Sequence, residues 1–382
     1  MPVERAAVIG AGTMGAEIAQ VIAEQGIPVK LKDVSQEFLE RGMRHVEAIL
    51  RRRVERGRLT DEEAAAQLAR IEPTLGYEDL ADVDFVIEAV PERLALKQAV
   101  FGDLNRACKP EAILATNTSS LSVGALAAAS GRPSHVVGFH FFNPASVMKL
   151  IEVVVTPETS EETTGATIAF GRQIGKLPVR VEECPGFLVN RILFAGMAEG
   201  MRYQHENRAS VASVDAAMRN KAGVPMGPFQ LADLVGLDVT DEIGKILETA
   251  YGDRFSTPPT LGELVAQGKL GQKSGEGYYR KDGTTIELGS NEADGDLLVQ
   301  QVMGACFLEA LRCLDEGVAT ANDIDLAMQA GAGWPVGPIA WAEQIGLSRL
   351  SAMLGALAVK VGPRFTPPAR FKALADSGGA LR

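Results

Sequence analysis

Apolar positions in the first half of the chain form short continuous runs, whereas beyond Asn190 they recur with a helical period. The runs begin at Ala6 and include Val83–Val90, Ala112–Ala115 and Val136–Phe142. Continuous apolar runs are typical of parallel strands that are covered on both faces. We therefore predict an α/β unit built on a parallel sheet, followed by an all-α region.

A glycine-rich turn follows the first predicted strand. The stretch AAVIGAGTMG places Gly10, Gly12 and Gly15 in a G-x-G-x-x-G pattern, and a helical pattern closed by Gly26 comes next. The first glycine permits a tight turn, the second lets backbone approach a pyrophosphate, and the third lets helix and strand pack closely. A second strand ends in Asp33, at the spacing of a carboxylate that binds a ribose 2′-hydroxyl. The motif indicates dinucleotide binding and favours NAD over NADP.

Polar side chains follow the predicted strands, where ligands of parallel sheets bind. These residues are Glu88, Glu92, Lys97, Asn117, Ser119 and His140. His140 lies in GFHFFNPASVMKLIEVV, an otherwise apolar segment that also contains Glu152. Burying an ionisable group without a partner costs several kcal/mol. The two residues are therefore candidates for a functional pair.

The helical region contains an internal repeat. The 24 residues from Val214 align without gaps with those from Ile324, and 11 of the positions are identical. Such self-similarity indicates two copies of one helical unit, joined by the polar linker KDGTTIELGSNEADGD. We predict three domains, with bounds 1–184 for the α/β unit, 185–285 for the first helical copy and 295–382 for the second.

The charge of the chain restricts its function. A net charge of -11 over 382 residues, with a pI near 5.1, argues against a general nucleic-acid or anionic-membrane surface. A local basic pocket is still compatible with this charge. The predicted helical stretch Gln36–Ile71 contains RRRVERGRL, which is either a solvated arm or a phosphate-binding face built from Arg52, Arg53 and Arg56.

The cysteine spacing and the hydropathy of the chain bear on its cellular compartment. The four cysteines have no CxxC spacing, so we expect neither a metal site nor a disulfide framework, and a reducing compartment fits. There is no signal-type N-terminus and no run of about 18 apolar residues. We expect a soluble, cytoplasmic protein without nucleic-acid or membrane partners.

Several segments together resemble the L-3-hydroxyacyl-CoA dehydrogenase family. In the family's order and spacing, across roughly Val8–Tyr279, they are GAGTMG, Asp33, VIEAVPE, TNTSSLSV, GFHFFNP, KLIEVV, CPGFLVNRIL and GQKSGEGYY. The chain is still more similar to the dehydrogenase region of multifunctional fatty-acid oxidation α-subunits, whose N-terminal region is an enoyl-CoA hydratase. Because this chain begins at the dinucleotide strand, hydratase activity is not expected. The resemblance implies a Rossmann-type NAD-binding domain, and with the internal repeat we expect it to be followed by two duplicated helical domains.

The resemblance also implies a reaction. The histidine of HFFNP, His140, would be the general base and the glutamate of KLIEV, Glu152, its partner. Oxidation of a secondary alcohol removes a proton from oxygen as hydride leaves carbon, and an imidazole suits the proton step near neutral pH. A turn at Asn143-Pro144 would place both groups on adjacent strands. We expect reversible oxidation of (3S)-3-hydroxyacyl-CoA to 3-oxoacyl-CoA, as in fatty-acid β-oxidation or 3-hydroxybutyryl-CoA metabolism.

Further roles are carried over by position from the family. Ser119 and Asn190 would lie near the substrate's hydroxyl and thioester carbonyl, and Arg56 near the CoA phosphates. The residues expected to contact NAD are Gly10, Gly12, Thr13, Met14, Gly15, Asp33, Glu92, Lys97, Asn117, Asn143 and Lys273.

The repeat affects the expected oligomeric state. Single-copy relatives dimerise through this helical domain, so the second copy can take the partner's place, and we predict a monomeric pseudo-dimer, with a dimer as the alternative. The second copy would have no active site, because Asn190 aligns with Gln300; an independent tail is the other interpretation. Two other functions stay open: a dehydrogenase of a free hydroxy acid, and a non-catalytic cofactor-binding protein.

Overall fold

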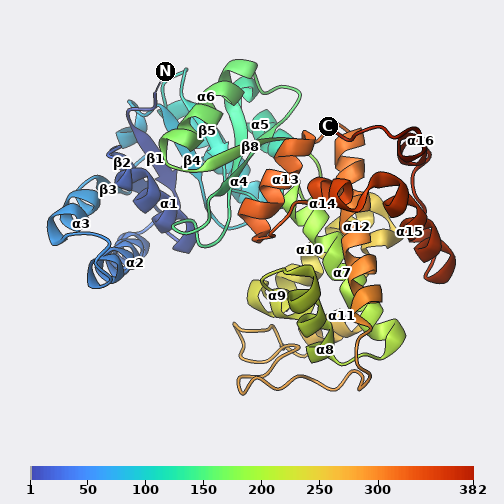
Figure 1. Cartoon of the computed structure of the whole chain (residues 1–382). Helices are drawn as coiled ribbons and strands as arrows, with labels where there is room; N and C mark the ends of the chain where they lie inside the picture. The colour runs from blue at the N-terminus through green and yellow to red at the C-terminus, as the bar shows by residue number, and fades with distance from the viewer. Residues whose placement is uncertain (1) are drawn as a thin grey trace. The chain divides into compact units, whose positions relative to one another are not determined.

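A computed structural model describes residues 2–382 and divides the chain between Glu183 and Cys184 into two compact units (Figure 1). The first unit is an α/β structure and the second is helical. The division lies next to the predicted bound at residue 184. Both predicted helical copies fall within the second unit.

The first unit is built on one eight-stranded sheet in the order β3-β2-β1-β4-β5-β6-β7-β8. Its strands are β1 (Ala6–Ile9), β2 (Val29–Lys32), β3 (Ile71–Thr74), β4 (Phe85–Glu88), β5 (Ile113–Thr116), β6 (Val136–Phe141), β7 (Leu150–Val155) and β8 (Leu177–Glu182). Neighbouring strands are parallel except β6 and β7, which are antiparallel. Every residue of β1, β4, β5 and β6 is buried, as the continuous apolar runs predict.

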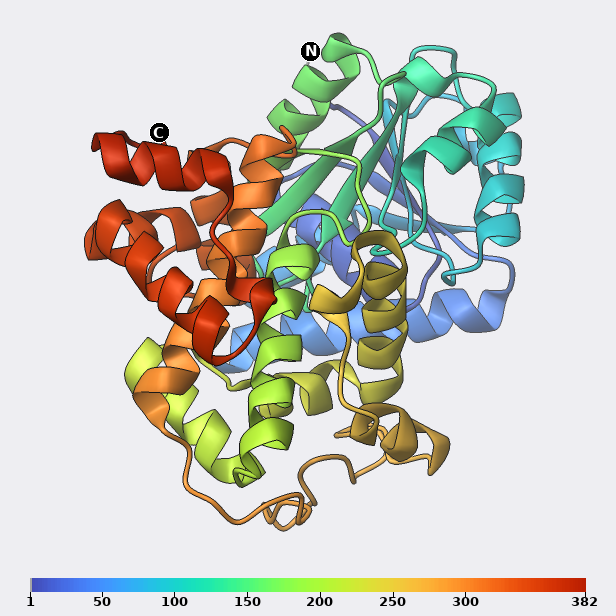
Figure 2. The same ribbon diagram turned by 90° about the vertical axis from the view of Figure 1, so that its right-hand side faces the viewer.

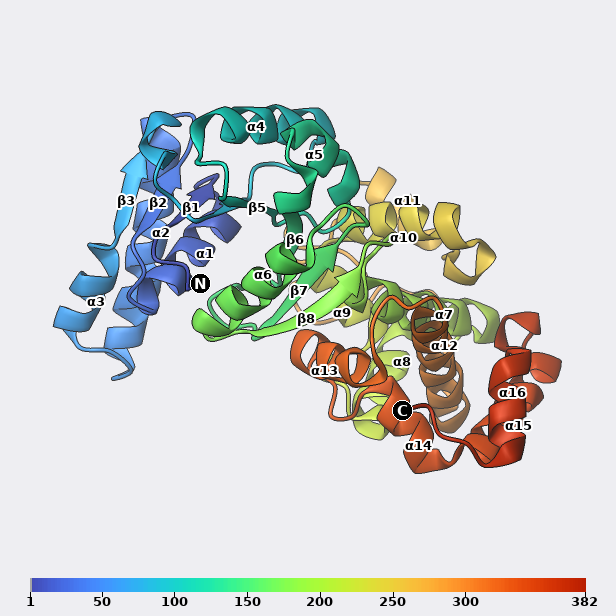
Figure 3. The same ribbon diagram turned by 90° about the horizontal axis from the view of Figure 1, so that it is seen from above.

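Helices cover both faces of this sheet. They are α1 (Thr13–Glu24), α2 (Gln36–Glu55), α3 (Asp61–Leu68), α4 (Leu94–Ala107), α5 (Val123–Ser130) and α6 (Glu161–Gln173), with short 3-10 turns at η1 (Glu78–Leu80) and η2 (Pro133–His135). Figure 3 shows α4 and α5 on one side of the sheet and α1 and α6 on the other. On the α6 side, the ring of Phe170 packs on Phe85 and Phe139, with centroid distances of 4.6 and 5.9 Å.

The predicted helix over Gln36–Ile71 is only partly correct, because the structure interrupts it. Gly57 has a φ of +66°, a left-handed conformation that ends helices readily. Thr60 and Glu63 then form a capping box that starts α3. Ile71 is already the first residue of the edge strand β3.

The second unit consists of helices. They are α7 (Val189–Asn207), α8 (Val211–Ala217), the π-helical turn η3 (Met218–Ala222), α9 (Pro228–Val235), α10 (Leu237–Tyr251), η4 (Asp253–Phe255), α11 (Thr260–Ala266), α12 (Gly295–Asp315), α13 (Ala321–Ala332), α14 (Pro338–Ile345), α15 (Leu347–Lys360), η5 (Pro363–Phe365) and α16 (Ala369–Ser377). In Figure 2 the yellow-green α7 lies beside the orange α12.

Helices α7 and α12 form the centre of the second unit. A Cβ added to Gly196 would lie 2.5 Å from the Sγ atom of Cys306, so a glycine is required for the two helices to approach this closely. By length and composition, α12 is the one helix in residues 2–382 that could cross a membrane. However, 67% of the apolar stretch of α12 is buried inside the structure, as in the core helix of a helical bundle.

Two turns in this unit are built in the same way. Asp215 accepts hydrogen bonds from the first N–H groups of α9 at 3.1 and 2.9 Å, and Asp325 accepts from those of α14 at 2.8 and 2.9 Å. A Cβ at Gly227 or at Gly337 would lie 2.2 Å from the adjacent aspartate oxygen. Each turn therefore needs its glycine, and each aspartate caps the helix that follows.

Candidate active site

The turn between β1 and α1 is shaped by three glycines with different surroundings. Gly10 has a φ of +105°, and a Cβ there would lie 2.7 Å from the carbonyl oxygen of Ala89. A Cβ at Gly15 would lie 1.8 Å from the carbonyl oxygen of Gly10. A Cβ at Gly12 would meet nothing within 4 Å. The fold thus requires Gly10 and Gly15, whereas Gly12 leaves open space at the N-terminus of α1, where unpaired N–H groups favour an anion.

Asp33 follows β2 and is bonded to this turn. Its Oδ2 atom accepts a hydrogen bond from the backbone N–H of Ala11 at 2.6 Å, and its Oδ1 atom accepts from the N–H of Val34 at 2.6 Å. The neighbouring Lys32 is buried, and its Nζ atom lies 4.1 Å from the centre of the Tyr77 ring. The carboxylate is therefore fixed beside the glycine turn, and the adjacent cation already has an aromatic partner.

A buried lysine organises the ends of β4 and β5. Lys97 is 1% exposed, and its Nζ atom lies 2.8 Å from Glu88 Oε1, 3.1 Å from the carbonyl oxygen of Val90 and 3.2 Å from Glu92 Oε2. Burial alone would raise the pKa of Glu92, but Lys97 and the hydrogen bonds that Glu92 accepts hold it below its usual value. Both carboxylates thus share one cation, and Lys97 contacts protein oxygens.

Glu92 in turn fixes the loop after β5. Its Oε1 atom accepts hydrogen bonds from the backbone N–H groups of Ser119 at 3.1 Å and Ser120 at 3.3 Å, and from the hydroxyl of Thr118. Asn117 at the start of this loop accepts a hydrogen bond from the N–H of Phe141 at 2.9 Å. The half-buried Ser119 is therefore held on a loop that is tied both to Glu92 and to the end of β6.

His140 and Glu152 occupy opposite positions in the antiparallel β6–β7 pair. The Nδ1 atom of His140 lies 2.7 Å from Glu152 Oε2, with the side chains 8% and 0% exposed. The ring of Phe142 packs against the imidazole at a centroid distance of 4.7 Å. A carboxylate at Nδ1 fixes the ring's orientation and directs Nε2 away from the pair, which is an arrangement suited to proton transfer.

The turn between these strands is held by two residues that the sequence does not single out. It starts at the exposed Asn143 and contains the cis peptide bond Asn143-Pro144. The Nζ atom of Lys176 donates to the carbonyl oxygens of Ala145 and Met148 at 2.5 and 2.7 Å. Glu17 in α1 accepts from the N–H and hydroxyl of Ser146, both at 3.1 Å. In the sequence, Glu17 is a charged residue within the largely apolar stretch AEIAQVIA, and this is the signal that could have suggested a role for it.

The remaining predicted residues lie elsewhere. Arg56 is the exposed C-cap of α2, while Arg53 in the same cluster is paired with Glu24. Asn190, half-buried, is the second residue of α7, and Lys273 is paired with Asp238, both in the helical unit. Thr13, which is exposed, and Met14, which is half-buried, begin α1 beside Gly12.

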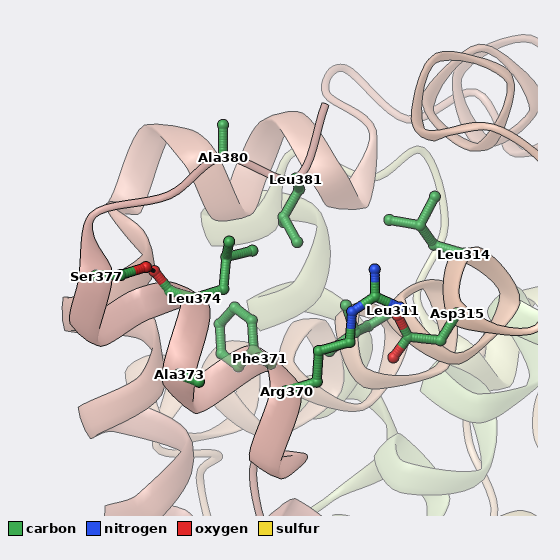
Figure 4. Close-up of a pocket in the computed structure, with 10 residues that line it drawn as sticks. All are labelled: Leu311, Leu314, Asp315, Arg370, Phe371, Ala373, Leu374, Ser377, Ala380 and Leu381. Atoms are coloured by element: carbon green, nitrogen blue, oxygen red, sulfur yellow. Dashed lines mark hydrogen bonds and ion pairs between the residues drawn. The ribbon is translucent and has the colours of Figure 1, made fainter.

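The helical unit also contains cavities. One of about 320 Å³ lies between α12, α16 and the C-terminal residues; Figure 4 shows Leu381, Leu374 and Phe371 around it and Arg370 beside Asp315, to which it is bonded at 2.7 Å. A larger one, of about 570 Å³, is lined by residues of α9 and of the turn around Gly271. Neither cavity is lined by a predicted site residue.

Comparison with known proteins agrees with the predicted family. Residues 5–184 match the model of the 3-hydroxyacyl-CoA dehydrogenase NAD-binding domain, and residues 186–281 and 298–380 both match that of the C-terminal domain. The fatty acid oxidation complex subunit alpha of Shewanella amazonensis is 36% identical, over 98% of this chain and 56% of its own length. The chain thus spans little more than half the length of the curated relatives it matches.

Two solved structures are similar. The 3-hydroxybutyryl-CoA dehydrogenase of Escherichia coli K12 is 32% identical, with a TM-score of 0.91 over 99% of this chain and 100% of that one. The (S)-3-hydroxybutyryl-CoA dehydrogenase of Ralstonia eutropha is 37% identical, with a TM-score of 0.70 over 72% of this chain and 98% of that one. The predicted NAD-binding domain and helical C-terminal region are confirmed, and the chain belongs to the 3-hydroxyacyl-CoA dehydrogenase family.

Proposed function

We propose that this chain catalyses the reversible, NAD-dependent oxidation of (3S)-3-hydroxyacyl-CoA to 3-oxoacyl-CoA. The observation that carries the proposal is the buried His140–Glu152 pair, in the same unit as a turn of dinucleotide-binding type. The Escherichia coli relative, which the chain matches over its full length, is named a 3-hydroxybutyryl-CoA dehydrogenase and supports the same reaction class.

The residues of the β1–α1 turn fit NAD. The space above Gly12 and the N–H groups at the start of α1, including Thr13 and Met14, would receive the pyrophosphate. Asp33 would accept a hydrogen bond from the adenosine ribose and repel a 2′-phosphate. Bound NAD supplies the hydride acceptor. These chain residues hold it, and none of them takes part in a proton transfer.

The proton step belongs to His140. In the oxidation direction, its Nε2 atom would accept the proton of the 3-hydroxyl group, which makes the ring an imidazolium. Glu152, 2.7 Å from Nδ1, would stabilise that charge and keep the ring oriented. In the reverse direction, the same Nε2 atom would return the proton to the alkoxide oxygen.

The other site residues would orient the reactants. Ser119 and Asn190 would contact the substrate's hydroxyl and thioester oxygens, and Arg56 a CoA phosphate. The residues that would line the nicotinamide end are Glu92, Asn117, Asn143 and Lys273. Because the ammonium of Lys97 is already surrounded by protein oxygens, we assign its effect on NAD to its hold on Glu92.

We further propose that the two helical segments arose by duplication and together form a monomeric pseudo-dimer. The two matches to one C-terminal domain model and the two like turns at Asp215 and Asp325 support the duplication. Light scattering of the purified chain tests the oligomeric state. A mass near 40.6 kDa is expected, and a stable mass of twice that value would contradict it.

The test of the function is the consumption of NADH with acetoacetyl-CoA and longer 3-oxoacyl-CoA substrates. We expect turnover by the native chain and a loss of several hundredfold or more in the His140→Ala variant, with NADH binding retained. If the native chain binds NADH but reduces none of these thioesters, the proposal fails. Turnover of free 3-oxo acids, or binding of NADH without any turnover, would then identify the alternative function.

A further inference from the structure

Arg191 follows Asn190 in α7, and its guanidinium group is held by the second helical segment. Its Nε atom donates to Glu309 at 2.8 Å. Its Nη1 and Nη2 atoms donate to the two oxygens of Glu316 at 2.6 and 2.9 Å. Both glutamates belong to the α12 region, more than a hundred residues along the chain from Arg191. Bidentate pairs of this kind are strong and directional.

The same arginine supports the segment that leads into α7. Its guanidinium lies 4.1 Å from the centre of the Tyr251 ring, and the hydroxyl of Tyr251 donates to the carbonyl oxygen of Pro185 at 3.1 Å. The backbone N–H of Arg191 donates to the carbonyl oxygen of Gly186 at 3.2 Å. Arg191 thus joins α12, Tyr251 and residues 185–186 at one point.

This segment needs such support. Phe187 has a φ of +50°, an uncommon conformation for a bulky residue, and Gly186 has a φ of +77°. Strained backbone persists where its surroundings over-determine it, and it gathers at functional sites. Arg191 is 0% exposed; although burial favours its neutral form, its acidic neighbours raise its pKa above the usual value. An ionised, immobile guanidinium therefore fixes the start of α7, where Asn190 lies.

The link occurs in only one half of the repeat. Glu199 and Glu206, which align with Glu309 and Glu316, both contact Arg364 of the second segment. The residue that aligns with Arg191 is Gln301, whose buried Oε1 atom has no hydrogen-bond partner. If the two halves packed in the same way, both would have an arginine at this position. Only the half that contains the proposed substrate residue has an arginine at this point.

We propose that Glu309 and Glu316 are positioning residues, which act through Arg191 to hold Asn190 in place for the reaction. The inference rests on the proposed function, in which Asn190 contacts the substrate. It assigns to the second helical segment a specific part in catalysis, although that segment lies far along the chain. Glu316 is the better residue to test, because its side chain is 48% exposed whereas Glu309 is buried at 1% and also pairs with Arg254 and Arg312.

The experiment compares Glu316→Gln with Glu206→Gln. Glu206 aligns with Glu316, is 44% exposed, and bonds Arg364 at 3.3 Å rather than Arg191. We expect Glu316→Gln to lower kcat about tenfold with the KM for NADH unchanged, and Glu206→Gln to keep the native kcat. Equal kcat values for the two variants would overturn the proposal, whatever their melting temperatures.

A double-mutant cycle separates positioning from general stability. In an Asn190→Ala background, Glu316→Gln should cause no further loss of kcat, since the residue it positions is gone. Multiplicative losses would contradict action through Asn190. Hydrogen exchange of residues 185–192 provides a readout that is independent of turnover: it should increase in Glu316→Gln and not in Glu206→Gln. If the native chain turns over no 3-oxoacyl-CoA, the proposed function fails, and this exchange comparison alone decides whether Glu316 holds the segment.

Discussion

His140 in β6 lies directly opposite Glu152 in β7, and the 2.7 Å contact between them spans 12 residues of sequence. Side chains along a strand alternate between faces, so a slip of one residue in the pairing would move either group to the other face of the sheet. The short turn after β6 therefore determines whether a functional pair forms. The residues that hold this turn therefore help to keep both side chains on the same face of the sheet.

Replacing Glu152 with Gln should lower kcat by about a hundredfold, because the amide keeps the side chain's size but cannot stabilise an imidazolium charge. The measurement is steady-state turnover of acetoacetyl-CoA with NADH. Affinity for NADH should stay within about twofold, since Glu152 lies in β7 and not in the β1–α1 turn. Native kcat in this variant would mean that the carboxylate serves packing alone.

The glycine turn allows a matched pair of substitutions. Gly12→Ala should leave the melting temperature nearly unchanged, because φ is -66° and a Cβ there meets nothing within 4 Å. It should nevertheless weaken NADH binding at least about tenfold, since the methyl group occupies the space in which the pyrophosphate approaches the backbone. Fluorescence titration with NADH measures this loss.

Gly15→Ala is the counterpart and should act on the fold. A Cβ only 1.8 Å from the carbonyl oxygen of Gly10 forces α1 away from β1, which should cost at least about 3 kcal/mol of unfolding free energy. Urea unfolding measures it. If both alanine variants lost stability equally, the open space at Gly12 would not exist.

Asp33→Ala should reduce the preference for NAD over NADP. The negative carboxylate that disfavours a 2′-phosphate is lost, and so is the acceptor for the N–H of Ala11. Asp33→Asn keeps an acceptor and removes only the charge, so it separates the two effects. The ratio of kcat/KM for the two cofactors is the readout, and an unchanged ratio in both variants would place the ribose contact elsewhere.

Lys176 should give the stability of the protein a distinctive pH dependence. Burial lowers the pKa of Lys176 from 10.5 to about 8, so between these values the unfolded chain binds more protons than the folded one. The contribution of this group to the unfolding free energy then rises with pH, by up to about 3 kcal/mol across that range.

The measurement is urea unfolding of the native chain and of Lys176→Met at pH 7 and pH 10. The difference between the two proteins should change in favour of the native chain as the pH rises. The exposed Lys360, replaced in the same way, provides the control, because its surroundings change little on unfolding. A constant difference for Lys176→Met would show that its ammonium is not desolvated.

The sequence predicts the elements whose signals are local. The buried strands appear as continuous apolar runs, and the β1–α1 turn appears as three spaced glycines. The edge strand β3 has only the residues IEPT, with two of four exposed, so no periodicity identifies it. The interruption of the predicted helix after Glu55 depends on the conformation of Gly57, which a helical pattern does not reveal.

The residues that support the site could not be predicted, because their partners are remote in sequence. Ser146 and Glu17 are 129 residues apart, and Arg191 and Glu309 are 118 apart. Arg191 and Glu309 resemble ordinary surface residues in the sequence, and nothing near Glu17 indicates that it binds Ser146. The candidate catalytic pair could be found because both members are ionisable residues in an otherwise apolar segment, and the family resemblance added their roles.

The close packing of Gly196 against Cys306 has a consequence for how the pairing of α7 with α12 depends on protein concentration. Gly196 and Cys306 are separated by the same number of residues as the aligned Val214 and Ile324, so they occupy matching positions in α7 and α12. The missing side chain at Gly196 leaves room for the side chain of Cys306. Two identical helices could not reproduce this unequal fit. Because α7 and α12 pack against each other within one polypeptide, we expect their pairing to be independent of protein concentration.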